Sequence, residues 1–216
     1  MPNRPLRPCL DRAESHHVPR PLPGGTWPLR KVIHAAMAAV PLAGWLWAPW
    51  AALALAAILL AGSLLLEAAR RAWPSVDRIL WGNAPALFRP AERRGVLGST
   101  WFAGSMLAVL LLFGQDVGGL GVLFLAFGDP VAELAGRRWG RPGLRKTWAG
   151  SIACLAACLV TAAGAALCSL LPPAAACSGA VAAAAAERWS PPPTDNLWIP
   201  FFSCLVMAAG MNLLAI

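Results

Sequence analysis

The chain has 216 residues, of which 58% are hydrophobic and 13% are charged. Soluble domains carry roughly twice that charged fraction, about 25%, so the composition excludes an ordinary water-soluble protein. The formal net charge is +8, but the basic residues form short clusters between apolar runs, without the soluble basic module that a nucleic-acid-binding protein needs. We therefore expect an integral membrane protein that binds no nucleic acid.

The N-terminal segment, residues 1–28, is rich in proline and arginine. It lacks the apolar core and the small-residue cleavage site of a secretory signal. We expect a disordered, basic cytoplasmic tail, followed by one membrane-embedded domain over residues 29–216.

Seven apolar stretches follow, most of them near the roughly 17 to 25 residues that cross a bilayer as a helix. The sixth is short and alanine-rich, and is the weakest. The predicted fold class is therefore all-α, a polytopic membrane helix bundle with about seven transmembrane helices. The stretches lie at about 32–48, 50–66, 98–114, 118–135, 151–171, 174–188 and 198–216.

The basic residues predict the orientation of this bundle. All 18 lysines and arginines fall within residues 1–31, 70–94 and 137–146 or at Arg188. Seven alternating helices place these four regions on one side of the bilayer, which the positive-inside rule makes cytoplasmic. We therefore expect a cytoplasmic N-terminus and an active site on the cytoplasmic side.

Asp129, Glu133 and Arg137 recur every four residues at the end of the fourth apolar stretch. On a helix, this spacing aligns two carboxylates and a guanidinium along one face. Charged groups beside a spanning helix are costly unless they are paired or hydrated, so the set is a candidate functional site. It can hold a divalent cation together with an anionic ligand. The alternative is an i, i+4 ion pair that needs no ligand.

A loop at 136–148 follows, with five cations and three glycines. Such a loop can bring its backbone close to phosphates. It is not a P-loop, because Arg145 stands where that motif requires a glycine before the lysine. The alternative is that its charge only fixes the topology.

Further polar residues reach the same predicted surface. The chain has only two lysines, Lys31 and Lys146. His34 lies one turn after Lys31, where it can contact a phosphate or relay a proton; a structural histidine is the alternative. Second-tier candidates, of which the last two can instead cap the final helix, are Glu67, Arg70, Asp195 and Asn196.

Several short motifs occur in an order that resembles the integral-membrane polyprenol kinases, the family of dolichol, phytol and farnesol kinases. The segment 128–151 is also similar to phosphatidate cytidylyltransferases. The motifs are Arg30-Lys31-x-x-His34, Glu67 with Arg70-Arg71, Gly98-Ser99-Thr100, Gly128-Asp129-Pro130, Gly136-Arg137, Lys146-Thr147-Trp148-Ala149-Gly150-Ser151 and Asp195-Asn196-Leu197.

The resemblance implies an enzyme that transfers the γ-phosphoryl group of CTP, or of another nucleoside triphosphate, to the hydroxyl of a lipid alcohol such as phytol, farnesol or dolichol. It implies Mg²⁺ as cofactor, with Asp129 and Glu133 as its ligands. The implied catalytic residues are Asp129, Lys146, Glu133 and His34. The implied nucleotide-binding and phosphate-binding residues are Lys31, Arg30, Arg137, Arg138, Arg145, Thr147 and Gly128.

Three alternatives remain open at this point. The first is CDP-lipid synthesis, as in the cytidylyltransferases. The second is a small-solute transporter, which predicts inverted repeats and polar residues near the bilayer midplane, and the sequence shows neither. The third is a structural membrane protein, which leaves the ordered motifs unexplained. The particular lipid alcohol and the oligomeric state are left open.

Overall fold

The computed structural model describes residues 27–83, 87–88, 90–93, 95–140, 146–190 and 194–214. Within these ranges the chain is all-helical, as predicted, and contains no strand. Most of the predicted tail and Arg145 lie outside the described residues. The helices are α1 (Trp27–Ala36), α2 (Ala39–Leu46), α3 (Pro49–Ala72), α4 (Pro74–Asn83), α5 (Gly98–Trp139), α6 (Trp148–Leu167), α7 (Pro173–Trp189) and α8 (Asp195–Leu214), with a short 3-10 helix at Pro90–Arg93.

The first apolar stretch, expected as one helix over 32–48, is broken into α1 and α2. Pro41 explains the break, because a proline ring clashes with the carbonyl four residues earlier, here that of Met37. The backbone makes a tighter turn at this point, since the N–H of Val40 donates to the carbonyl of Met37, three residues earlier, at 3.1 Å. The break leaves α1 as a short helix of its own, which carries Lys31 and His34.

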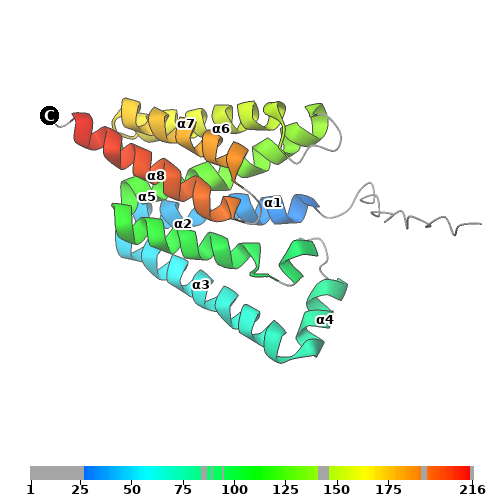
Figure 1. Cartoon of the computed structure of the whole chain (residues 1–216). Helices are drawn as coiled ribbons and strands as arrows, with labels where there is room; N and C mark the ends of the chain where they lie inside the picture. The colour runs from blue at the N-terminus through cyan, green and yellow to red at the C-terminus, as the bar shows by residue number, and fades with distance from the viewer. Residues whose placement is uncertain are drawn as a thin grey trace, which may run out of the picture.

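Helix α5 is a hairpin of two arms, not one continuous rod. Gly114 has a left-handed φ of 76°, which a glycine adopts without strain. A side-chain carbon placed on Gly118 would lie 2.5 Å from the carbonyl oxygen of Val109, whereas nine residues of straight helix span about 13 Å. The chain therefore turns back at Gly114 (Figure 1). The arms, 98–113 and 115–139, correspond to the third and fourth predicted stretches.

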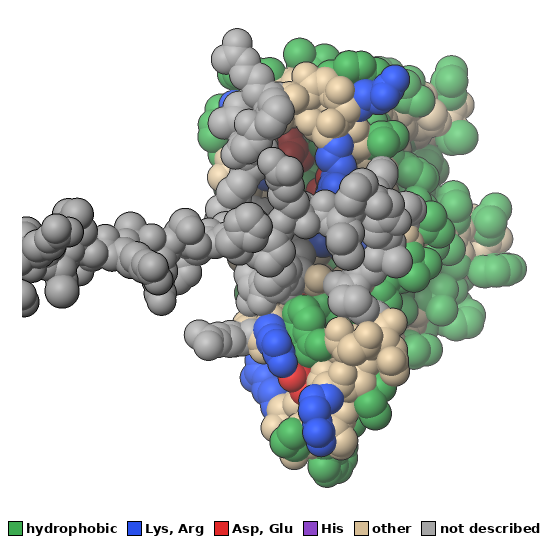
Figure 2. Space-filling model, turned by 90° about the vertical axis from the view of Figure 1, so that its right-hand side faces the viewer, with side chains coloured by type: hydrophobic (Ala, Val, Ile, Leu, Met, Phe, Trp, Pro, Cys, Tyr) green, Lys and Arg blue, Asp and Glu red, His purple; other side chains and the backbone are tan. Residues whose placement is uncertain are grey.

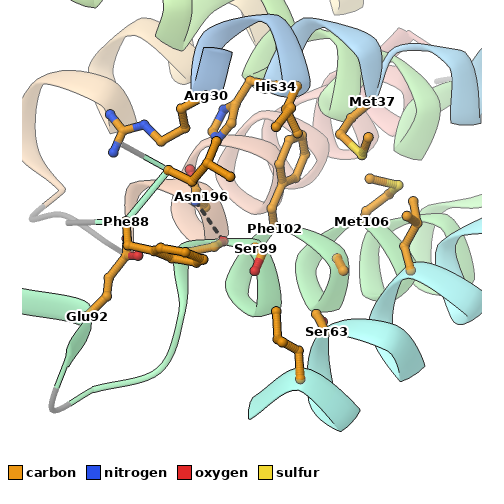
Figure 3. A pocket seen from close by; sticks show the side chains of 16 residues that line it. Arg30, His34, Met37, Ser63, Phe88, Glu92, Ser99, Phe102, Met106 and Asn196 are labelled. Carbon is orange, nitrogen blue, oxygen red and sulfur yellow. Dashed lines mark hydrogen bonds between the residues drawn. The ribbon is translucent and has the colours of Figure 1, made fainter. Parts of the chain in front are cut away.

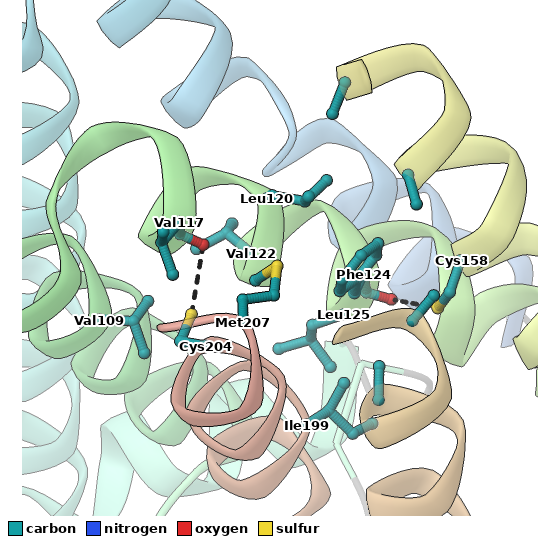
Figure 4. Close-up of a cluster of buried hydrophobic side chains, with 14 of the residues drawn as sticks. Val109, Val117, Leu120, Val122, Phe124, Leu125, Cys158, Ile199, Cys204 and Met207 are labelled. Carbon is teal, nitrogen blue, oxygen red and sulfur yellow. Dashed lines mark hydrogen bonds between the residues drawn. The ribbon is translucent and has the colours of Figure 1, made fainter. Parts of the chain in front are cut away.

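The second arm of α5 forms the centre of the bundle. Its middle residues are fully buried and pack against α6, α7 and α8 (Figure 4). Small residues allow this close packing, since a side-chain carbon on Gly128 would lie 2.9 Å from Cys158 Sγ of α6. The arm leads directly into Asp129 and Glu133. Its fully buried apolar residues are Leu120, Val122, Phe124, Leu125 and Ala126.

In the part of the chain that the structure describes, three helices, α3, α5 and α6, are long and apolar enough to cross a membrane. The seven predicted stretches fall in α1 with α2, in α3, in the two arms of α5, and in α6, α7 and α8. The count of seven crossings and the cytoplasmic N-terminus stay predictions.

Charged side chains gather at one end of the bundle. At this end α1 begins, and α3, the second arm of α5 and α7 end (Figure 1). Viewed from this end, basic side chains lie beside acidic ones (Figure 2). Asp116 lies at the opposite end, beside the turn of the α5 hairpin, and accepts a 2.8 Å hydrogen bond from Trp45 Nε1.

Candidate active site

Lys31 is the centre of the first charged cluster. Its Nζ lies 2.6 Å from Asp129 Oδ2 and 2.7 Å from Glu133 Oε2. Lys31 and Asp129 are 98 residues apart in the chain, and both are buried. Removing either partner of such a pair leaves an uncompensated buried charge. The ammonium therefore holds α1 against α5 and occupies the position between two carboxylates that a small cation can take.

Two arginines complete this cluster around Glu133. Arg30 Nη2 donates to Glu133 Oε2 at 3.0 Å. Arg137 donates to Glu133 Oε1 through Nε and Nη2, at 3.0 and 2.6 Å. The i, i+4 pair that the spacing predicted is thus present, but it is not isolated, because Lys31 and Arg30 reach the same carboxylate. Three cations face two carboxylates here, an excess of positive charge that favours an anionic ligand.

His34 connects this cluster to a neighbouring cavity. Its Nδ1 lies 3.6 Å from Asp129 Oδ2. The imidazole ring packs against Phe102 of α5, with ring centroids 4.9 Å apart. A carboxylate beside an imidazole orients the ring and stabilises its protonated form. His34 is therefore placed to move a proton beside Asp129.

Lys146 is the centre of a second charged cluster. Its Nζ lies 2.8 Å from Glu187 Oε1 and 3.9 Å from Asp195 Oδ2. Ser151 Oγ donates to the other oxygen of Glu187, Oε2, at 3.1 Å. Glu187 and Asp195 are both buried. Each of the two lysines thus stands between two carboxylates. Both carboxylates beside Lys31 belong to α5, whereas those beside Lys146 belong to α7 and α8.

The start of α8 links the second cluster to the cavity beside the first. Asp195 faces Lys146, whereas Asn196 lines the cavity near His34. Asn196 Nδ2 donates to the carbonyl of Gly98 at 2.9 Å. Asp195 Oδ1 also accepts a hydrogen bond from the backbone N–H of Asn196 at 3.1 Å. Asp195 therefore makes a local contact at the start of α8 in addition to facing Lys146. These two residues, 1% and 3% exposed, are as central to the site as the predicted catalytic residues.

Glu67 and Arg70 form a third, buried cluster near the end of α3. Arg70 Nη2 lies 2.5 Å from Glu67 Oε1, and its guanidinium donates to the carbonyls of Arg93 and Gly95. The N–H of Leu97 donates to Glu67 Oε2 at 3.3 Å. This ion pair therefore fixes the segment that leads into α5. Glu67 and Arg70 support the cavity wall instead of lying in the first two clusters.

A cavity of about 270 Å³ opens beside His34, between α1, α3, the first arm of α5 and the start of α8 (Figure 3). Its polar lining includes Arg30, His34, Glu92 and Asn196. The rest of the lining is largely apolar and includes Ile33, Met37, Leu59, Leu66, Phe88, Phe102, Ala103 and Met106. The cavity thus joins a polar end to an apolar interior.

The remaining predicted phosphate-binding residues have other contacts. Thr147 caps α6, with its Oγ1 accepting from the N–H of Gly150 at 3.1 Å. Gly128 packs against α6. Arg138 is exposed at the end of α5. The structure brings Arg30, Lys31, Asp129, Glu133 and Arg137 together. Within the described part of the chain, no side-chain hydrogen bond or ion pair joins Thr147, Gly128 or Arg138 to this cluster, and Arg145 lies outside the described residues.

Two buried carboxylates were missing from the predicted site, Glu92 and Glu187. Glu187 follows an alanine-rich stretch in the sequence, and in the structure it pairs with Lys146. Glu92 stands in a polar segment between helices, where nothing in the spacing separates it from a solvated residue. The structure buries it beside Gly98, on which a side-chain carbon would lie 3.0 Å from Glu92 Oε1.

The fold and the site define a helical membrane protein whose lysines and carboxylates meet in buried clusters at one end of an apolar bundle. No family model matches the chain, and no solved structure is similar to it. Over 197 residues the chain is 30% identical to a phytol kinase from Synechocystis sp., covering 85% of this chain and 79% of the relative. The chain therefore belongs to the phytol kinase family of polyprenol kinases. The similarity of residues 128–151 to cytidylyltransferases stays a prediction.

Proposed function

We propose that this protein is a lipid-alcohol kinase, which transfers the γ-phosphoryl group of a nucleoside triphosphate, CTP in preference, to the hydroxyl of an isoprenoid alcohol. The phytol kinase relative supports the reaction class. The observation that carries the proposal is the cluster of Lys31, Asp129 and Glu133, buried at the charged end of an apolar bundle. The preference for CTP rests on the family resemblance.

The reaction joins the alcohol oxygen to the γ-phosphorus, while the bond from that phosphorus to the β,γ-bridging oxygen breaks and the nucleoside diphosphate leaves. The hydroxyl proton passes to His34, beside Asp129. Phosphoryl transfer has a loose transition state with its charge spread over oxygens, so catalysis depends on positioned cations. Lys31, Arg30 and Arg137 supply them at the first cluster, and Lys146 supplies one at the second.

Mg²⁺ is the cofactor of this proposal, with Asp129 and Glu133 as its protein ligands. In the structure, the Lys31 ammonium lies between one oxygen of Asp129 and one oxygen of Glu133. Carboxylate oxygens of this kind are the ligands that Mg²⁺ prefers. Among the described residues, no group of three or more His, Cys, Asp or Glu side chains is arranged to hold a metal ion. This pattern fits Mg²⁺, which is usually held by one or two carboxylates together with substrate phosphates. When bound, the ion neutralises charge on the phosphates.

The location of the clusters suits both substrates. A nucleotide arrives from water at the charged end, whereas a lipid keeps its chain among apolar helices and presents only its hydroxyl. Under the positive-inside rule this end faces the cytoplasm, where nucleoside triphosphates are made.

The direct test is an assay of the purified, detergent-solubilised protein with Mg²⁺ and CTP labelled at either the γ or the α phosphate. Phytol, farnesol, a longer polyprenol and diacylglycerol serve as acceptors, and phosphatidate is added in a separate reaction. We expect γ label in the phosphorylated isoprenoid and no α label in lipid. Transfer of the α label to phosphatidate would instead show a cytidylyltransferase, and no transfer from CTP, ATP or UTP would refute the kinase.

A further inference from the structure

Asn196 lines the cavity beside His34 and carries a buried polar atom that the described protein leaves without a partner. Asn196 is 3% exposed, and its Nδ2 donates to the carbonyl of Gly98 (Figure 3). That bond identifies Oδ1 as the remaining amide atom. Among the described residues, no group donates to Asn196 Oδ1, although it is buried. A buried acceptor of this kind is stabilised by a ligand that donates a hydrogen bond.

The surroundings of Asn196 lead toward the reacting groups. Gly98 is where Asn196 and Glu92 meet, since a side-chain carbon there would lie 3.2 Å from Asn196 Nδ2 and 3.0 Å from Glu92 Oε1. His34 lines the same cavity, and its Nδ1 is 3.6 Å from Asp129 Oδ2. A hydroxyl at Asn196 therefore lies in the cavity that adjoins the first charged cluster.

The rest of the cavity suits a hydrocarbon chain. Met37, Leu59, Phe102 and Met106 line it, and methionine side chains adapt their shape to irregular apolar ligands. Its volume of about 270 Å³ is near the lower limit of roughly 300 Å³ for ligand pockets. This space is large enough for the hydroxyl end of one branched chain, but not for two acyl chains side by side.

Two other cavities in the described part of the chain lack this combination. One of about 910 Å³ lies between α2, the second arm of α5 and α6, and one of about 410 Å³ lies between α7 and α8. Neither lining includes a charged residue. Both face outward from the bundle, where bilayer lipid itself can fill them.

We infer that the cavity beside His34 is the acceptor site, that it takes a single isoprenoid-type chain, and that Asn196 Oδ1 accepts a hydrogen bond from the alcohol hydroxyl. This inference rests on the proposed function and specifies where its acceptor binds and what limits its size. It adds Asn196 to the substrate-binding residues and gives Ala103 and Met106 a role in chain selection.

Binding without nucleotide tests the site independently of turnover. A phytol analogue with a photoreactive diazirine is cross-linked to the wild-type protein, and phytol, phytol methyl ether and diacylglycerol compete. We expect labels on peptides that contain Met37, Leu59 or Met106, with protection by phytol about tenfold better than by the ether, which cannot donate a hydrogen bond. Diacylglycerol should not protect. Labels confined to the cavity between α2, the second arm of α5 and α6, called the α6 cavity below, would overturn the inference.

Two variants make the test residue-specific. Asn196→Leu removes the acceptor and should abolish the preference for phytol over its methyl ether. Ala103→Leu fills the cavity and should raise the alcohol KM about tenfold with the nucleotide KM unchanged, whereas its matched control in the α6 cavity, Ala157→Leu, should change neither. The reverse result for the two alanines would refute the site. Mapped binding without phosphoryl transfer would refute the kinase alone, and transfer with labels elsewhere would refute this inference alone.

Discussion

At the scale of single residues, the important contacts join side chains that are distant in the sequence. Lys31 and Asp129 are 98 residues apart, and Lys146 and Glu187 are 41 apart. Each lysine is held by carboxylates, so a change in one group alters the charge that its neighbours present. Because of this coupling, the most informative substitutions are those that remove a charge and keep the shape of the side chain.

Asp129→Asn should lower turnover by about 100-fold or more, because it removes the carboxylate that pairs with Lys31 and His34 while keeping the shape of the side chain. The measurement is γ-phosphoryl transfer to phytol, with thermal unfolding in detergent as the check on folding. Asp116→Asn, at the opposite end of the bundle, is the matched control and should keep wild-type activity. Full activity of Asp129→Asn would refute its role in metal binding and catalysis.

Lys146→Ala tests the second cluster. Removing the ammonium leaves the buried Glu187 with only Ser151 among its described donors, and it removes a cation from the proposed phosphate site. We expect the nucleotide KM to rise or kcat to fall by about 10-fold to 100-fold, with the alcohol KM unchanged. Steady-state kinetics with each substrate varied in turn separates these effects. A change in the alcohol KM alone would contradict the assignment.

At the scale of elements, the sequence predicts the helices better than the junctions between them. The apolar stretches identify the long helices. Gly114, followed by the polar residues Gln115 and Asp116, marks the turn of the hairpin. The break at Met37 depends on Pro41, which lies within a stretch that is otherwise apolar and therefore reads as one helix. Helix α4 was not predicted, because its mixed composition lies within a basic segment.

The ion pair of Glu67 with Arg70 controls the segment before α5. Glu67→Gln leaves the buried Arg70 with only Asp77, whose Oδ1 lies 3.9 Å from Nη1, as a countercharge among the described residues. Removing one partner of a buried ion pair costs about 3 to 5 kcal/mol. We therefore expect a clear fall in the unfolding temperature in detergent. Arg78→Gln, on the exposed face of α4, is the control and should change stability by less than about 0.5 kcal/mol. Equal stability of both variants would show that the pair does not hold this segment.

The α5 hairpin requires close contact at Gly118. Gly118→Ala should destabilise the fold by about 1 to 3 kcal/mol, because the added carbon would overlap the Val109 carbonyl. Gly62→Ala is a matched substitution within α3, with no atom within 4 Å of the added carbon, and should be neutral or stabilising by about 0.5 to 1 kcal/mol. Unfolding in one detergent compares them, and a neutral Gly118→Ala would contradict the hairpin.

At the scale of the whole molecule, the sequence predicts where the charges gather but not which of them touch. Periodicity is enough to place Glu133 and Arg137 together, since both stand on one helix. The pairing of Lys31 with Asp129 and of Lys146 with Glu187 depends on how separate helices pack, which no local pattern encodes. The family resemblance drew attention to Lys31 and Lys146, which the structure places among buried carboxylates. It left Asn196 in the second tier and omitted Glu92.

The orientation of the molecule can be measured with single-cysteine variants. Cys168 is exposed at the end of α6, opposite the charged end, and Arg78→Cys places a thiol on α4 at the charged end. In sealed vesicles of known sidedness, a membrane-impermeant maleimide should label Arg78→Cys only from the cytoplasmic face and Cys168 only from the other. The opposite pattern would invert the predicted topology.

The 98-residue separation of Lys31 and Asp129 has a consequence for biosynthesis. At about 5 to 20 residues per second of translation, Lys31 is made roughly 5 to 20 s before its partner. During that interval the first helix carries an ammonium without its final countercharge, and such a charge is expensive at depth in a bilayer. The first helix is therefore expected to stay near the interface until the second arm of α5 is inserted, so that stable integration of the N-terminal segment and assembly of the site occur in the same step.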